Sequence, residues 1–166
     1  MAVAARCNTS GMFKNIVVGT DGSDSAAIAV HQAAALARTC GGTLHIVHAF
    51  SPVSITAAAF SAGSGGPIIE IDRLNESIAT GGATVCAEAA AAAAAEGTSV
   101  QTHNEAGDPT DVLIRAVRDV GADLLVVGNR GMTGLKRFML GSVPNKIAHH
   151  APCSLLIVDT TSHASK

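Results

Sequence analysis

Short apolar runs rich in β-branched residues alternate along this chain with longer segments of helical periodicity. The runs predict strands at residues 16–18, 44–49, 99–104, 124–127 and 155–158. The segments between them predict helices at residues 25–39, 68–96, 109–120 and 143–150, with a candidate break at Gly81 and Gly82. This alternation predicts an α/β domain with an open parallel sheet, right-handed crossovers and helices on both faces, as in Rossmann-like folds.

A glycine-rich segment, residues 126–143, lies between the fourth predicted strand and the last predicted helix. A backbone that approaches a phosphate closely needs residues without a Cβ or with a left-handed φ, and Gly128, Gly131 and Gly141 meet that need. Ser142 adds a hydroxyl and an N–H group in the first helical turn, where the helix dipole favours negative charge. We interpret the segment as an anion cradle; the alternative is that its glycines only form turns.

Charge along the same part of the chain supports an anionic ligand. Residues 124–158 contain no Asp or Glu, yet they carry four of the chain's eleven Lys and Arg residues. Arg130 lies between the first two glycines, where its planar guanidinium suits two oxygens of one phosphate. Lys136 and Arg137 follow on the loop, and Lys146 lies in the predicted helix. The alternative is that these side chains form a solvated basic face.

Asp21 follows the first predicted strand and precedes the first predicted helix. One interpretation is that Asp21 caps this helix, in competition with Ser23. The other is that its carboxylate faces a ligand and accepts hydrogen bonds from an amine or a hydroxyl. The two roles are compatible.

The pattern G-x2-G-x9-G-[ST], formed by Gly128, Gly131, Gly141 and Ser142, resembles the nucleotide-binding signature of the universal stress protein family. Residues 14–23 resemble that family's first strand and turn, residues 107–109 the entry to its third helix, and residues 122–128 its fourth strand. The resemblance implies one universal stress protein domain over residues 12–159, with five strands in the order 3-2-1-4-5. Residues 1–11 and 160–166 are expected to be disordered because they are short and show no periodicity.

The implied strand order places a ligand between strands one and four, where the winding of the sheet reverses. Both the turn after strand one and the glycine-rich loop leave the sheet at that edge. The predicted nucleotide-binding residues are Gly19, Thr20, Asp21, Ala49, Val127, Gly128, Asn129, Arg130, Gly131, Gly141, Ser142 and Val143.

The resemblance implies ATP, with or without Mg²⁺, as the ligand of a nucleotide-dependent stress-response regulator. Cyclic AMP is the alternative, because some family members with a loop like residues 128–131 prefer it. Pro144 weakens the case for a triphosphate, since proline lacks the N–H that could contact phosphate. A third possibility is a ligand-free scaffold, which the intact glycine pattern disfavours.

No enzymatic activity is expected. The sequence contains none of the patterns G-x-S-x-G, H-E-x-x-H and G-x-x-x-x-G-K-[ST]. A slow ATPase would usually need metal-binding carboxylates near the terminal phosphate, and the glycine-rich loop has no acidic residue.

Composition argues against several other classes of partner. A net charge of −2 without Trp or Tyr disfavours nucleic-acid binding, which uses basic faces or aromatic stacking. No uninterrupted apolar run reaches the about 18 residues expected of a membrane span. The four cysteines form no C-x-x-C pair, so neither a disulfide framework nor a metal site is expected. These features predict a cytoplasmic protein.

The last strand, from Leu155 to Val158, is apolar on both faces, yet the implied order makes it an edge strand. Exposed apolar edges favour aggregation, and proteins usually cover them. We therefore expect a homodimer in which this strand pairs with its own copy, as the resemblance also implies. The alternative is that one of the terminal segments folds over the edge.

Overall fold

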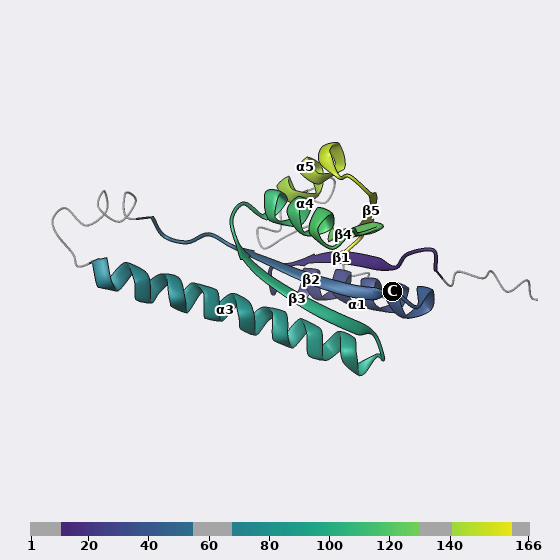
Figure 1. The fold of residues 1–166 in the computed structure, drawn as a ribbon, viewed down its shortest axis with the longest axis horizontal. Coiled ribbons are helices and arrows are strands. Elements are labelled where there is room, and N and C mark those ends of the chain that lie inside the picture. The colour runs from purple at the N-terminus through teal and green to yellow at the C-terminus, as the bar shows by residue number, and fades with distance from the viewer. Residues whose placement is uncertain (1–10, 55–67, 130–140, 161–166) are drawn as a thin grey trace, which may run out of the picture.

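The computed structural model describes residues 11–54, 68–129 and 141–160, which form a five-stranded parallel sheet between two layers of helices (Figure 1). The strand order, β3-β2-β1-β4-β5, and the α/β class confirm the predicted fold. The strands are β1 (Asn15–Thr20), β2 (Thr43–Phe50), β3 (Ser99–Ala106), β4 (Leu124–Gly128) and β5 (Ser154–Val158). The helices are α1 (Asp24–Cys40), α3 (Ile68–Ala95), α4 (Pro109–Asp119) and α5 (Ser142–His150). The predicted leader and tail lie outside the described residues, apart from Gly11 and Thr160.

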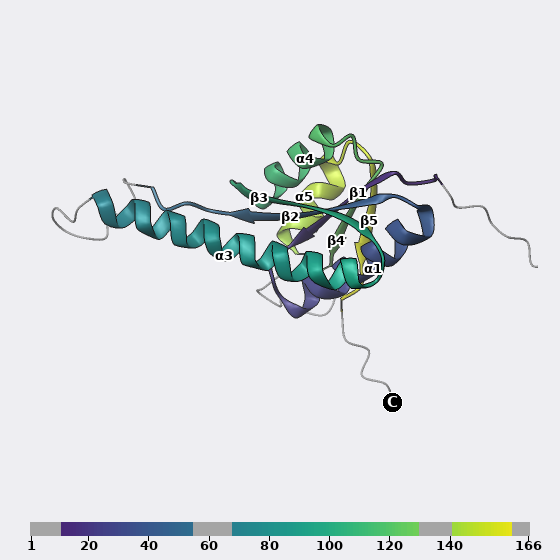
Figure 2. The ribbon, with the colours of Figure 1, turned by 60° about the horizontal axis from the view of Figure 1, so that its bottom comes forward.

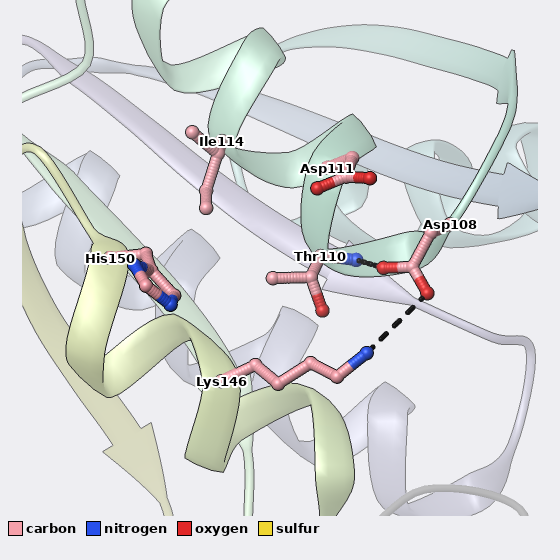
Figure 3. Close-up of a pocket in the computed structure, with 6 residues that line it drawn as sticks. All are labelled: Asp108, Thr110, Asp111, Ile114, Lys146 and His150. Atoms are coloured by element: carbon pink, nitrogen blue, oxygen red, sulfur yellow. Dashed lines mark hydrogen bonds and ion pairs between the residues drawn. The ribbon is translucent and has the colours of Figure 1, made fainter.

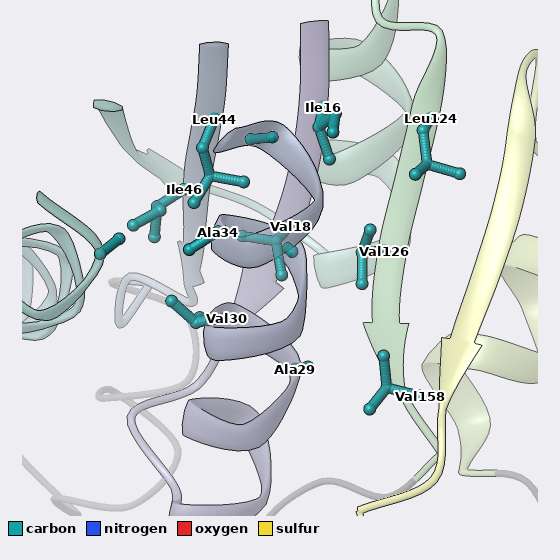
Figure 4. Close-up of a cluster of buried hydrophobic side chains, with 13 residues drawn as sticks. Ile16, Val18, Ala29, Val30, Ala34, Leu44, Ile46, Leu124, Val126 and Val158 are labelled. Carbon is teal, nitrogen blue, oxygen red and sulfur yellow. The ribbon is translucent and has the colours of Figure 1, made fainter. Parts of the chain in front are cut away.

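Helices α1 and α3 cover one face of the sheet, and α4 and α5 cover the other (Figures 1 and 2). Alternate residues of each central strand enter opposite cores because successive side chains of a strand point to opposite faces. Ile16 and Val18 of β1 pack in the core under α1, which Figure 4 shows, whereas Val17 packs in the core under α4. Strand β1 is therefore buried on both faces, as parallel strands usually are.

Helix α3 runs without interruption from Ile68 to Ala95, so the expected break at Gly81 and Gly82 is wrong. Gly82 instead permits close packing. A Cβ there would lie 2.7 Å from Nδ1 of His48, and it would also collide with Oδ1 of Asn104. These two side chains share a hydrogen bond of 2.9 Å, and Asn104 Nδ2 donates to the Ala79 carbonyl of α3 at 2.7 Å.

The N-terminal half of α3 lies beside the extended chain that follows β2 (Figure 1). The side-chain amide of Asn75 bonds both backbone groups of Val53: the Val53 N–H donates to Oδ1 at 2.7 Å, and Nδ2 donates to the carbonyl at 3.1 Å. The Asn75 side chain thus satisfies the two backbone groups of Val53, as a neighbouring strand would.

Residues Ile71–Ala95 of α3 are long and apolar enough to cross a membrane by length and composition alone, with a mean hydropathy of 1.3. Glu88 interrupts the apolar run, as expected from the sequence, and the segment passes on its average composition because alanine is very frequent here. Helix α3 packs on β2 and β3 with Cys86 and Ala93 buried, but only 17% of the apolar 18-residue window is buried. A single helix that passes this test does not by itself show a membrane span.

Two histidines pair on the face of the sheet that α4 covers. His45 Nδ1 and His103 Nε2 lie 3.2 Å apart, and His45 is only 5% exposed. Burial lowers the pKa of His45, and the neighbouring His103 lowers it further. His45 Nε2 has no hydrogen-bond partner among the described residues, so a proton added to this ring would be poorly solvated.

The two adjacent glycines of α3 provide a matched pair of substitutions. Gly81→Ala should stabilise the protein by about 0.5–1 kcal/mol, because the position is open and alanine favours helix. Gly82→Ala should destabilise it by about 1–3 kcal/mol, because the new Cβ overpacks against His48 and Asn104. Urea unfolding of both variants measures the difference; equal effects would contradict the packing role of Gly82.

Acid should weaken the fold through His45. Above pH 6.5, the ordinary histidine pKa, the His45 ring is neutral in both the folded and the unfolded protein. Below pH 6.5 only the unfolded chain readily takes up the proton. The free energy of unfolding should therefore fall as pH drops below 6.5, by at most about 1.4 kcal/mol per pH unit for this group. His45→Gln should flatten the curve between pH of about 6.5 and 5. Parallel curves for wild type and His45→Gln would refute this origin.

Candidate functional site

A cavity of about 460 Å³ opens at the carboxyl ends of β1, β2 and β4, between α4 and the start of α5. The winding of the sheet reverses between β1 and β4, which is where open α/β sheets bind ligands. Most of the predicted nucleotide-binding residues line this cavity: Gly19, Thr20, Asp21, Ala49, Val127, Gly128, Gly141, Ser142 and Val143. Two segments about a hundred residues apart in sequence are thereby brought together.

Sequence reasoning overlooked part of the wall. Pro109 and Leu113 of α4 line the cavity, as does Ala26 of α1. Leu113 is an apolar residue of a predicted core element, and its sequence pattern does not distinguish a cavity wall from ordinary core. Pro144, noted only for its missing N–H, also lines the cavity.

The remaining predicted site residues are not among those that line the cavity. Arg130 and Gly131 lie outside the described residues, as do Lys136 and Arg137. Asn129 is described, but it is absent from the cavity wall.

Asn129 instead connects three parts of the fold. Its Oδ1 accepts from the N–H and the hydroxyl of Thr160, at 3.0 and 2.7 Å, and its Nδ2 donates to Asp159 at 2.9 Å. Its backbone carbonyl accepts from the Gly141 N–H at 3.0 Å, and its own N–H donates to the Val158 carbonyl at 2.8 Å. Asn129 therefore fixes Gly141, at the cavity wall, against the ends of β4 and β5.

The first turn of α5 presents uncommitted donors to the cavity. Gly141 is the N-cap and provides no side-chain cap, and the Asn145 N–H already donates to the Gly141 carbonyl at 3.1 Å. Pro144 has no N–H. The N–H groups of Ser142 and Val143 meet no acceptor within the part of the chain that the structure describes.

Neither Gly128 nor Gly141 has a positive φ, so the backbone conformation itself does not require glycine at these positions. A Cβ on Gly141 would make only an ordinary contact of 3.5 Å with Pro144. Of the two reasons predicted for glycine here, a left-handed backbone is therefore excluded at Gly128 and Gly141, and packing against the described residues does not explain Gly141 either.

Ser23, rather than Asp21, caps α1: its hydroxyl accepts from the Ala26 N–H at 3.2 Å. Asp21, two residues before the cap, holds the Ser23 side chain in place. Its Oδ1 accepts from the Ser23 N–H at 3.0 Å and from the Ser23 hydroxyl at 2.5 Å. Asp21 also lines the cavity, so its carboxylate gives that end of the cavity a negative charge.

Among the described residues, no Lys or Arg lines this cavity. His48 does, but its ring nitrogen is bonded to Asn104, as expected of a histidine with a structural role. No group of three or more His, Cys, Asp or Glu side chains in the described ranges is arranged to hold a metal ion.

A second depression, of about 540 Å³, lies between α4 and α5 (Figure 3). Asp108, the N-cap of α4, accepts from the Thr110 N–H through Oδ1 at 2.9 Å, and its Oδ2 lies 3.7 Å from Lys146 Nζ. The Thr110 N–H is the main cause of the lowered pKa of Asp108, and the charge of Lys146 contributes less. The other residues around the depression are Asp111, Ile114 and His150.

Comparisons with known proteins support the resemblance seen in the sequence. The model of the "Universal stress protein family" matches residues 12–159. The chain is 32% identical to universal stress protein YxiE of Bacillus subtilis over 147 residues, covering 89% of this chain and 99% of the relative. It is 35% identical to universal stress protein Rv1636 of Mycobacterium tuberculosis over 157 residues, covering 90% and 98%.

The fold is also similar to that in a crystal structure of a universal stress protein in complex with cAMP, with a TM-score of 0.64 and 32% identity. That match covers 90% of this chain and 98% of the other. Because the family model spans most of the chain and these relatives match along nearly their whole length, the protein belongs to the universal stress protein family.

Proposed function

We propose that this protein binds an adenine nucleotide in the cavity between β1 and β4 and regulates a stress response through its bound state. The observation that carries the proposal concerns the first turn of α5. Ser142 and Val143 both line the cavity, and their N–H groups are uncommitted among the described residues. A helix N-terminus of this kind favours phosphate, because both its N–H groups and its dipole attract negative charge.

Gly141 supports the same placement of phosphate. Neither its φ nor its packing against the described residues calls for glycine, yet it lies at the cavity wall at the start of α5. Close approach of a ligand oxygen to the backbone is a sufficient reason for the missing side chain.

The opposite end of the cavity suits a nucleoside. Val47, Leu113 and Val127 offer apolar contacts to a base, while Thr20 and Asp21 offer oxygen atoms to an amine or to ribose hydroxyls. The volume of about 460 Å³ lies within the usual range for sites that hold small organic ligands.

ATP is the first candidate, with or without Mg²⁺. Any Mg²⁺ would rely mainly on phosphate oxygens, because residues 124–158 contain no carboxylate side chain. Cyclic AMP is the second candidate, and two observations favour it. Pro144 reduces the donors available to a chain of phosphates, and a family member of 32% identity has been crystallised with cAMP.

The proposal includes no catalysis. Hydrolysis of ATP would need a group to position or deprotonate water near the terminal phosphate, and Asp21 lies instead at the end of β1. The expected cytoplasmic location belongs to the same proposal.

Ser142→Asp separates ligand binding from folding. An acidic residue in the first turn of α5 is favourable for the helix, so the thermal midpoint should stay the same or rise. The same charge should repel a phosphate and weaken nucleotide binding by about tenfold or more, whereas Ser142→Ala, which loses only the hydroxyl, should weaken it less. Calorimetric titration of both variants with ATP and with cAMP measures these affinities. Unchanged affinity in Ser142→Asp would refute the site.

We also propose the homodimer expected from the sequence. Strand β5 is an edge of the sheet, pairs with β4 alone, and leaves Leu156 36% exposed. Residues 159 and 160 bond to Asn129 and so do not cover the free edge, which counts against the described part of the tail as its cover. Light scattering at micromolar concentration should give the mass of two chains, and the mass of one chain would contradict the β5 dimer.

A further inference from the structure

Among the described residues, the phosphate end of the proposed site has few sources of positive charge. Within that part of the chain, only the N–H groups of Ser142 and Val143 in the first turn of α5 are uncommitted, and Pro144 supplies none. No Lys or Arg of the described ranges lines the cavity. A bound phosphate would therefore attract any nearby cation that is only weakly held elsewhere.

Lys146 is such a cation. It follows Ser142 by one helical turn, so the two residues lie on the same face of α5. Side chains of a helix lean toward its N-terminus, which brings the Lys146 stem over the turn that contains Ser142. Figure 3 shows this side chain extended toward Asp108, and Asp108 directly precedes Pro109 of the cavity wall.

The ion pair that holds Lys146 is weak. Its nitrogen and oxygen lie 3.7 Å apart, and the side chains are 57% and 47% exposed. Exposed pairs of this kind contribute little to stability. Asp108 would also keep its cap on α4 without Lys146, because the cap uses the other carboxylate oxygen. The depression of about 540 Å³ around the pair leaves the lysine side chain room to move.

We propose, on the basis of the nucleotide site proposed above, that Lys146 exchanges Asp108 for the phosphate of a bound nucleotide. Asp108 then acts against the ligand in two ways: it competes for the lysine and places a negative charge near the phosphate. The pair sets affinity according to ligand charge, so its effect is larger for ATP than for cyclic AMP.

Two charge-removing substitutions should act in opposite directions. Lys146→Gln should weaken ATP binding by about five- to tenfold and cyclic AMP binding by about twofold at low ionic strength. Asp108→Asn should strengthen ATP binding by about two- to fivefold, and asparagine retains the helix cap. Both effects should shrink in high salt, because mobile ions screen exposed charges.

Calorimetric titration of the full chain with ATP and with cyclic AMP, at two salt concentrations, provides the measurement. Lys146→Arg should bind as wild type does, because it keeps the charge. Asp111→Asn removes a carboxylate from the same depression without touching the ion pair, so it should have a smaller effect than Asp108→Asn. Thermal unfolding of each nucleotide-free variant checks that the fold is retained.

The outcomes distinguish this inference from the proposed function. If wild type binds nucleotide and Lys146→Gln binds equally well, the role of Lys146 is refuted while the site stands. If Asp108→Asn and Lys146→Gln both weaken binding, the pair only supports the fold, and the exchange is refuted. If wild type binds neither ATP nor cyclic AMP, both proposals are overturned.

Discussion

The burial of β1 and β4 on both faces is the constraint on which the rest of this structure depends. Val17, Val18, Leu125 and Val126 are fully buried, so helices must cover both sides of the sheet. Right-handed crossovers can cover both sides only if the chain winds outward from the centre in two directions. The reversal sends the chain from the ends of β1 and β4 to helices on opposite faces of the sheet, and the cavity lies at that point. A site thus arises from the same packing that stabilises the sheet.

Residue pattern alone predicts the elements, whereas most of the cavity wall needs the family resemblance as well. The β-branched runs and helical periodicities are local signals, and the order of the strands followed from the family resemblance. The turns at residues 19–21 and 141–143 could be assigned to the site because parallel strands present their carboxyl ends at one edge. These inferences needed only topology.

Several differences between expectation and structure concern interactions between distant residues. Gly82 has the local signature of a helix break, and only the positions of His48 and Asn104 reveal it as a packing site. Asn129 follows Gly128 directly and is predicted to contact the ligand, and only the structure shows that its side-chain amide bonds Asp159 and Thr160. Leu113 reads as core because cavity walls and cores use the same apolar residues. Sequence periodicity carries no information on such pairings.

The hydrogen bonds of Asn129 have a practical consequence for protein engineering. They fix Asp159 and Thr160 beside the residue whose carbonyl positions Gly141. The described part of the chain therefore ends close to the start of α5, and a segment fused directly after Thr160 would begin near the cavity. A purification tag with many histidines or acidic residues placed there would bring its own charge to the phosphate end. A tag before Gly11, whose N–H bonds the Cys40 carbonyl at the end of α1, would begin at the opposite end of that helix from Asp21.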